Sequence, residues 1–538
     1  MRMSLAEYQN RVKGCWMGKN IGGTLGAPFE CARGVVELDF YSQDMSGGAW
    51  PNDDLDLQLA WLNAAERYGR SVNAQVLGEY WIDYIVANWS EYGGGKNNLR
   101  QGLIPPLSGS CNNVNRNSCG AFIRSELWAC LAPGHPEIAV RYAFEDAIVD
   151  HADEGVYGEI FCAAVQSAAF VETDTNTLLD IGLSYIPVDC GIAKGIAVVR
   201  ESRQNGLDWQ AARKAVLNAV PGIFGMYRGY CYGEKEDDVP VGESGYDAPS
   251  NVAITVLGWL YGEGDFGRSL CIATGCCEDA DCTAATLGAL LGIQLGFDAL
   301  PAKWLDPIGE GIKNVALNTV EGLDIPATIS DLTDRVVRLM PTFLERSFDL
   351  IAEEGAVLHL REGKDLYDAL RLQKGRFYAP TFKDYILHHD KSIYSENRIL
   401  KTKLICRDGL NVQNDVPLRF TFEVLNPLWR QQWLAFHWDL PEGWEVSTGR
   451  DFSLNLDNFD GVRQMNFSFT VTPHDLQQAV YDLNLRVSSA GRPSALFIPI
   501  KLFNSPNAQP SAVDILKRGD GVSSRQTDIA AGYANYVE

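Results

Sequence analysis

The chain has 538 residues, of which 46% are hydrophobic and 21% are charged, so it carries enough apolar material for a large core and is not disordered by composition. Its 69 acidic and 46 basic residues give a formal net charge of −23, which argues against general binding to nucleic-acid phosphates. A phosphorylated substrate would need a local positive charge, and divalent cations bound in a carboxylate cluster are the simplest source of it.

The first twenty residues, MRMSLAEYQNRVKGCWMGKN, lack the apolar run and the cleavage site of a secretory signal. No segment approaches the roughly 18 uninterrupted apolar residues of a membrane span. Several of the thirteen cysteines lie inside apolar helical patterns, as Cys130, Cys162 and Cys271 do, which indicates reduced core side chains. We therefore expect a cytoplasmic protein that does not span a membrane.

Residues 5–370 show apolar positions at helical spacing, as Leu55, Leu59 and Leu62 illustrate. Small residues are frequent in these stretches, and patches such as GALLG suggest helices packed closely against one another. We therefore predict a large all-α domain over residues 1–380. The long Gly-, Asn- and Asp-rich loops between its helices are where binding groups are expected.

The pattern changes after about Tyr394 to short alternating runs such as LRFTFEVL and ALFIPIKLF, which predict a β-sandwich over residues 395–506. We interpret its tryptophans as core residues rather than as a sugar-stacking platform; they are Trp429, Trp433, Trp438 and Trp444. Residues 507–538 are predicted to be a C-terminal tail.

The first carboxylate cluster is the segment WPNDDLD, residues 50–56, directly ahead of a helical run. An Asn or Asp at a helix start is an ordinary cap. Three carboxylates with an asparagine in five positions exceed what one helix end can use, and they repel one another unless a cation lies between them.

The second cluster is CCEDADCT, residues 276–283, which leads into the run AATLGALLGIQLG. That run is apolar on nearly all sides and predicts a buried helix, where unpaired carboxylates would be costly. Oxygen ligands without histidine suit Mg²⁺, Mn²⁺ or Ca²⁺ rather than zinc. If the two clusters meet in space, they would hold one or two such ions.

Together with a third segment, these clusters resemble the ADP-ribosylglycohydrolase family, which includes the dinitrogenase-reductase-activating glycohydrolases. Residues 11–18, continuing to residues 22–30, look like the family's first helix and its GDALG-x-x-x-E ending. WPNDD looks like the family's TDD motif, and EDADCT looks like its D-x-D-T motif. The resemblance covers roughly residues 5–300 in the family's order.

The resemblance implies a multi-domain glycosidase, with a helical ADP-ribosylglycohydrolase-like catalytic domain followed by an all-β immunoglobulin-like sandwich. It implies Glu30 as the catalytic residue and Mg²⁺ as the cofactor, as one or two ions, with Mn²⁺ as an alternative. The implied metal ligands are Asn52, Asp53, Asp54, Asp279, Asp281, and Cys282 or Thr283. Three residues depart from the family pattern: Asn52 and Cys282 replace threonines, and Gly23 replaces an aspartate.

The segment NSCGAFIR, residues 117–124, resembles the family's glycine-rich substrate loop, and His151 lies where the family has a Thr-His pair near the ligand. The implied substrate-binding residues are Asn117, Ser118, Cys119, Gly120 and His151. The loop is rich in asparagine, as Asn113 and Asn115 show, and such amides would suit a sugar with many hydroxyl groups.

The expected reaction is hydrolysis at an anomeric carbon, with metal ions holding the vicinal hydroxyls of a ribose and Glu30 as acid or base. The expected substrate is an ADP-ribosylated or related small-molecule glycoside. One alternative is a cytoplasmic furanosidase that acts on a different glycoside, which the asparagine-rich loop and the β-sandwich favour. Another is an inactive, metal-stabilised binding module, which Gly23 and Cys282 favour. The sequence leaves the oligomeric state open.

Overall fold

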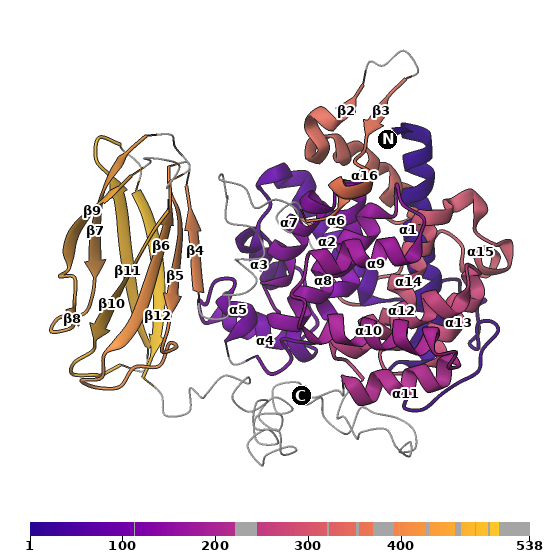
Figure 1. The fold of residues 1–538 in the computed structure, drawn as a ribbon, viewed down its shortest axis with the longest axis horizontal. Coiled ribbons are helices and arrows are strands. Elements are labelled where there is room, and N and C mark those ends of the chain that lie inside the picture. The colour runs from indigo at the N-terminus through magenta and orange to yellow at the C-terminus, as the bar shows by residue number, and fades with distance from the viewer. Residues whose placement is uncertain are drawn as a thin grey trace.

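The computed structural model describes residues 1–111, 113–220, 245–319, 322–350, 355–368, 392–397, 399–426, 428, 430–457, 464–478, 480–492 and 495–504. It contains a helical domain and a β-sandwich that lies beside it (Figure 1). No helix within the described ranges combines the length and the apolar character needed to cross a membrane. The predicted tail, residues 507–538, lies outside the described residues.

The helical domain confirms the predicted all-α class. Its helices are α1 (Leu5–Gly26), α2 (Asp53–Tyr68), α3 (Ala74–Asp83), α4 (Ser90–Arg100), α5 (Leu107–Ser110), α6 (Glu126–Leu131), α7 (Pro136–Ala147), α8 (Asp153–Ala168), α9 (Thr175–Ser184), α10 (Gly191–Gln204), α11 (Trp209–Ala219), α12 (Ala248–Gly262), α13 (Phe266–Gly275), α14 (Ala280–Leu295), α15 (Ala302–Ile308) and α16 (Ile329–Leu344).

Helix α14 runs through the middle of the domain and is buried over nearly its whole length, as its apolar sequence predicts. Helices α1, α12 and α13 pack around it. At the domain surface, α16 presents one apolar face to the core, with Leu332, Val336 and Phe343 buried. Burial of these faces provides the main favourable free energy of folding.

Helices α1 and α14 cross antiparallel along a seam of small residues spaced four apart. On α1 these are Gly14, Gly18, Gly22 and Gly26, and opposite them on α14 are Gly292, Gly288, Ala284 and Ala280. A Cβ atom built on Gly18 would lie 2.0 Å from the carbonyl oxygen of Gly288, so only glycine allows this approach. Because the two helices run antiparallel, the C-terminal end of α1 meets the N-terminal end of α14.

A small antiparallel sheet joins the chain start to the end of the helical domain. Its order is β1-β3-β2, from β1 (Arg2–Ser4), β3 (Val357–His359) and β2 (Phe348–Asp349). Strand β1 leads directly into α1, and Ser4 caps that helix by accepting a hydrogen bond from the backbone N–H of Glu7.

The β-sandwich consists of two antiparallel sheets that enclose a second core. The first sheet has the order β4-β5-β6-β10-β8, from β4 (Ser392–Glu396), β5 (Lys401–Cys406), β6 (Leu418–Leu425), β10 (Gln464–Thr472) and β8 (Glu445–Val446). The second has the order β12-β11-β7-β9, from β12 (Ala495–Phe503), β11 (Val480–Ser489), β7 (Gln432–Asp439) and β9 (Asp451–Leu456).

Alternation of buried and exposed residues along each strand sets the register. On β7, Leu434, Phe436 and Trp438 point into the core, whereas the side chain of Trp433 is 56% exposed. The core interpretation is therefore right for Trp438 and for the buried Trp444, and wrong for Trp433, because strand periodicity turns position 433 outward. Trp429 lies outside the described residues.

The segment between α4 and α5 forms a packing contact between the two domains. Its Leu103, and Leu107 at the start of α5, are buried in the same apolar core as the sandwich strands. Figure 1 shows α4 and α5 on the side of the helical domain that faces the sandwich.

Candidate functional site

The N-terminus of α2 brings the first carboxylate cluster into the domain. Asn52 caps this helix, because its side-chain oxygen accepts a 2.7 Å hydrogen bond from the backbone N–H of Asp54. Asp53 accepts a 2.8 Å hydrogen bond from the hydroxyl of Tyr92. Asp56 turns away, and its carboxylate accepts hydrogen bonds from the backbone N–H groups of residues 315 and 316. Asp56 is therefore structural, which leaves Asp53 and Asp54 at the helix end.

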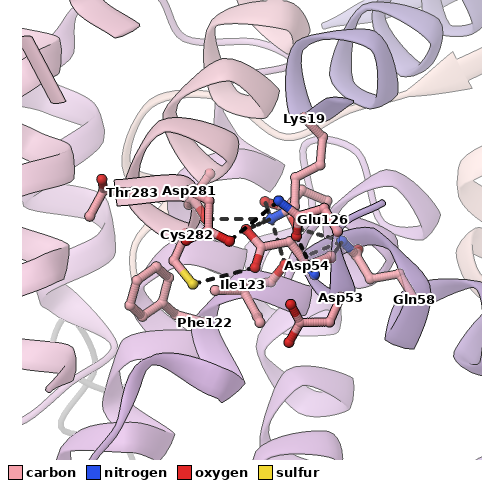
Figure 2. Close-up of polar contacts among 12 residues, drawn as sticks. Lys19, Asp53, Asp54, Gln58, Phe122, Ile123, Glu126, Asp281, Cys282 and Thr283 are labelled. Carbon is pink, nitrogen blue, oxygen red and sulfur yellow. Dashed lines mark hydrogen bonds and ion pairs between the residues drawn. The ribbon is translucent and has the colours of Figure 1, made fainter. Parts of the chain in front are cut away.

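The N-terminus of α14 carries the second cluster, with Asp279 as the residue that precedes the helix. The side chain of Cys282 points toward Asp54, with its Sγ atom 3.4 Å from Oδ1 of that carboxylate (Figure 2). The hydroxyl of Thr283 donates instead to the carbonyl of Ala280 and points away from the cluster. The structure therefore brings Cys282, and not Thr283, into contact with the carboxylates.

Glu30 follows a short 3₁₀ helix, Ala27–Phe29, which comes directly after α1. The antiparallel seam therefore places Glu30 beside the start of α14. Ligand atoms of Glu30, Asp279 and Asp281 all lie within 4.8 Å of one another. Glu30 is exposed, while Asp279 and Asp281 are buried. The three carboxylates thus form a group that opens to solvent at Glu30.

A second group shares Asp281 and consists of Asp54, Asp281 and Cys282, whose ligand atoms also lie within 4.8 Å of one another. All three side chains are buried. Two segments that are more than two hundred positions apart in the sequence therefore converge, as the motif order predicts. The N-termini of α2 and α14 both point at these groups, and their helix dipoles favour negative charge there.

The carboxylates repel one another at this separation, and the pKa values reflect it. Burial raises the pKa of Asp54 and of Asp279 well above the ordinary value of a carboxyl group. Burial, with the charge of Asp53, raises the pKa of Asp281 to about 6. The charge of Asp281 raises the pKa of Glu30 to about 9, and desolvation of its carboxyl group beside the buried aspartates adds to this shift, although the residue as a whole is exposed. A bound divalent cation would reverse these shifts.

The donor atoms fit a hard divalent cation. Oδ1 of Asp279 and Oδ1 of Asp281 are buried and have no hydrogen-bond partner within the described part of the chain. A buried carboxylate oxygen left in this state is costly, and a cation would satisfy it. Carboxylate oxygens in the absence of histidine match the ligands that Mg²⁺ and Mn²⁺ take.

A buried lysine, Lys19, lies beside Asp54 of the carboxylate cluster, and the sequence did not predict this contact (Figure 2). Nζ of Lys19 lies 3.7 Å from Oδ2 of Asp54 and 3.1 Å from Oε1 of Glu126. The side-chain amide of Gln58 donates to the other oxygen of Glu126. Lys19 interrupts the small and apolar run GCWMGKNIGG of α1, and this unexpected charge is the signal that could have revealed it.

Two of the departures from the family pattern are linked in space. A Cβ atom built on Gly23 would lie 2.3 Å from Nδ2 of Asn52. The same Nδ2 atom lies 3.5 Å from Oδ2 of Asp281. The missing side chain at position 23 therefore provides the room in which Asn52 lies, between α1 and α14.

The predicted substrate loop lies within the short segment Cys119–Arg124 and its preceding turn, and all of its predicted residues are buried. The side chain of Asn117 accepts a hydrogen bond from the backbone N–H of Glu154 at the start of α8. Gly120 packs against Glu91, since a Cβ atom there would lie 2.0 Å from the Glu91 carboxylate. The thiol of Cys119 lies near Asp279. Burial raises the pKa of this thiol, and the charge of Asp279 raises it further.

His151 lies behind this loop in a buried polar network. Its Nε2 atom lies 3.2 Å from Oγ of Ser118, and its Nδ1 atom lies 2.9 Å from a carboxylate oxygen of Asp150. Arg124 holds the same carboxylate from the other side at 2.5 Å. Asn117, Ser118 and His151 thus use their polar groups inside the protein, and their predicted role in substrate binding stays a prediction.

Comparison with known proteins identifies the family. The model of the ADP-ribosylglycohydrolase family matches residues 4–341. The chain belongs to the ADP-ribosylglycohydrolase family. It is accordingly an enzyme of the glycoside hydrolase class.

A solved structure named "ADP-ribosylglycohydrolase-related protein complex" is 18% identical over 63% of this chain and 98% of its own. Its TM-score is 0.40. No curated protein sequence matches the chain.

Proposed function

We propose that this glycoside hydrolase depends on Mg²⁺ and cleaves the bond between a ribose and its leaving group in an ADP-ribosyl or related ribosyl adduct. The observation that carries the proposal is the group of Glu30, Asp279 and Asp281, in which an exposed carboxylate lies within 4.8 Å of two buried ones. We assign the buried pair, with Asp53 and Asp54, to the metal and Glu30 to the reaction.

Each residue has a role that follows from its position. When bound, the cation supplies the positive charge that holds the vicinal hydroxyls of the sugar and favours ionisation of a nearby water. Glu30 lies at the open side of the group, where it can reach both solvent and substrate. Its raised pKa, about 9 without metal, lets it hold a proton, and a cation would lower that pKa. Glu30 can therefore act as acid or base.

The first test separates binding from chemistry. Glu30→Gln removes the proton-transfer group and preserves size, so we expect it to bind Mg²⁺ or Mn²⁺ with unchanged affinity and to lose turnover by about 10²–10⁴-fold. Glu37→Gln is the matched control, because Glu37 lies on the same connecting segment outside both groups. Full activity in Glu30→Gln would refute the assignment.

The furanosidase alternative differs in its substrate. Calorimetry with ADP-ribose, in Mg²⁺ and again in EDTA, tests the main proposal. Metal-dependent binding supports it, whereas absence of binding in a protein shown to hold Mg²⁺, together with hydrolysis of an aryl furanoside, would favour the alternative. The asparagines of the substrate loop do not favour a free sugar, because Asn113 donates to two backbone carbonyls within the protein.

A further inference from the structure

Position 282 provides a sulfur atom where the surrounding groups provide oxygen. Sγ of Cys282 lies 3.4 Å from Oδ1 of Asp54, and both belong with Asp281 to one group within 4.8 Å. The side chain is only 7% exposed. The neighbouring hydroxyl of Thr283 is turned away onto the carbonyl of Ala280 and does not compensate.

The surroundings of Cys282 differ from those of a structural cysteine. A buried cysteine of the core packs as a small apolar side chain. Cys282 instead faces two carboxylates, and a thiol is only a weak hydrogen-bond donor to them. Oδ1 of Asp281 is also buried without a hydrogen-bond partner in the described residues. A cation between these three side chains would satisfy the unpaired oxygen and use the sulfur as a ligand.

Lys19 determines on which side of Asp54 such an ion could lie. Its Nζ atom lies 3.7 Å from Oδ2 of Asp54, while Cys282 approaches Oδ1. Oδ2 thus lies in an ion pair with the ammonium but has no hydrogen bond within the described residues, and Oδ1 faces the sulfur, where a cation could lie.

We propose that Cys282 is a metal ligand, and that the subsite of Asp54, Asp281 and Cys282 takes a transition metal ion such as Zn²⁺, Co²⁺ or Fe²⁺ in preference to Mg²⁺. This inference rests on the proposed function, which requires a divalent cation at the cluster. Thiolates select such ions, whereas carboxylates alone suit Mg²⁺ and Mn²⁺. The buried carboxylates of Asp279 and Asp281, which provide oxygen ligands alone, remain the harder subsite. On binding, the thiol proton is released to solvent and a metal–sulfur bond forms, without oxidation or reduction.

The test uses the full-length protein stripped of metal and titrated with Co²⁺, Zn²⁺ and Mg²⁺. A thiolate bound to Co²⁺ gives a charge-transfer absorption in the near ultraviolet that carboxylate ligands do not give. We expect this band in the wild-type protein and its loss in Cys282→Ser. The control is Cys111→Ser, a half-buried thiol outside both groups, which should retain the band.

The affinities give the second readout. Cys282→Ser should weaken Zn²⁺ binding by more than the roughly 10–100-fold that loss of an outer-shell partner costs, with little effect on Mg²⁺. Cys282→Thr, which restores the family residue, should shift the preference toward Mg²⁺. As a control, a cooperative thermal unfolding transition in each metal-free variant would show that the variant is folded.

The outcomes separate the two proposals. If Co²⁺ binds to the wild-type protein without the charge-transfer band, the role of Cys282 is refuted, whereas a metal-dependent glycosidase remains. If no divalent cation binds at all, the proposed function fails as well. If Cys282→Ser retains the band, another residue supplies the sulfur and the inference is wrong.

Discussion

A methyl group at Gly18 tests how the α1–α14 seam supports the site. The Cβ atom of Gly18→Ala would lie 2.0 Å from the carbonyl oxygen and 2.5 Å from the carbonyl carbon of Gly288, where ordinary contacts begin at 3.4 Å. The helices must separate by more than an ångström, because both clashing atoms belong to the backbone. Overpacking costs about 1–3 kcal/mol, and alanine returns about 1 kcal/mol of helix propensity. Because the clash is with backbone, we take an overpacking cost of about 3 kcal/mol. Subtracting the gain in helix propensity, we expect the free energy of unfolding to fall by about 2 kcal/mol.

The separation should also reach the site, because Glu30 follows α1 and Asp281 lies on α14. We expect Mn²⁺ affinity, measured by calorimetry, to fall together with stability, measured by urea unfolding. Gly311→Ala is the control, because no atom lies within 4 Å of its Cβ position and its backbone is not left-handed. A change there should stay within about 0.5 kcal/mol. If Gly18→Ala is as stable as wild type and binds Mn²⁺ equally well, the seam does not position the site.

Three further predictions concern the charges of the site. Asp281→Ala should abolish Mn²⁺ binding in calorimetry, because Asp281 belongs to both groups; retained binding would show that the ion lies elsewhere. In the metal-free protein, the folded-state pKa values of Asp281 (about 6) and Glu30 (about 9) exceed the ordinary values of 3.8 and 4.5, so the folded state binds protons more tightly. Thermal stability should therefore fall as pH rises from about 4 to 9, with a shallower slope in Glu30→Gln; an equal slope would contradict the shift. Lys19→Met leaves Glu126 without its buried cation and should cost about 3–5 kcal/mol in urea unfolding, whereas Lys13→Met, which breaks a partly exposed pair, should cost at most about 1 kcal/mol.

The sequence alone predicted the parts of the fold that depend on local pattern. Capping chemistry at Asn52 and the acidic start of the apolar run at Asp281 both place carboxylates at helix N-termini, and the structure has them there. The frequent small residues of the helical region, as in the patch GALLG, predicted closely packed helices, which the seam between α1 and α14 confirms. The alternating runs after residue 394 likewise predicted the sandwich.

What the sequence could not show depends on rotamers and on pairing between distant segments. Cys282 and Thr283 are adjacent, and only the helical geometry decides that the sulfur faces Asp54. The partners of Lys19 come from α2 and α6, so its charge could be noticed in the sequence but not explained. The loop asparagines suggested sugar binding, yet the amide of Asn113 holds the backbone together.

The departures from the family pattern no longer favour the inactive binding module. Taken singly, Gly23 suggests loss of an acidic side chain, and Cys282 suggests loss of a hydroxyl ligand. In the structure the side chain of Asn52 occupies the space next to Gly23 and caps α2, and the sulfur of Cys282 still faces Asp54. Asp54 stays within reach of Asp281, and Glu30 stays beside Asp279. A chain that had lost its function would have no need to preserve two oxygen-rich groups with buried, unpaired oxygens, since each such oxygen costs stability when no cation is bound. This cost supports the proposed binding of a cation at the site.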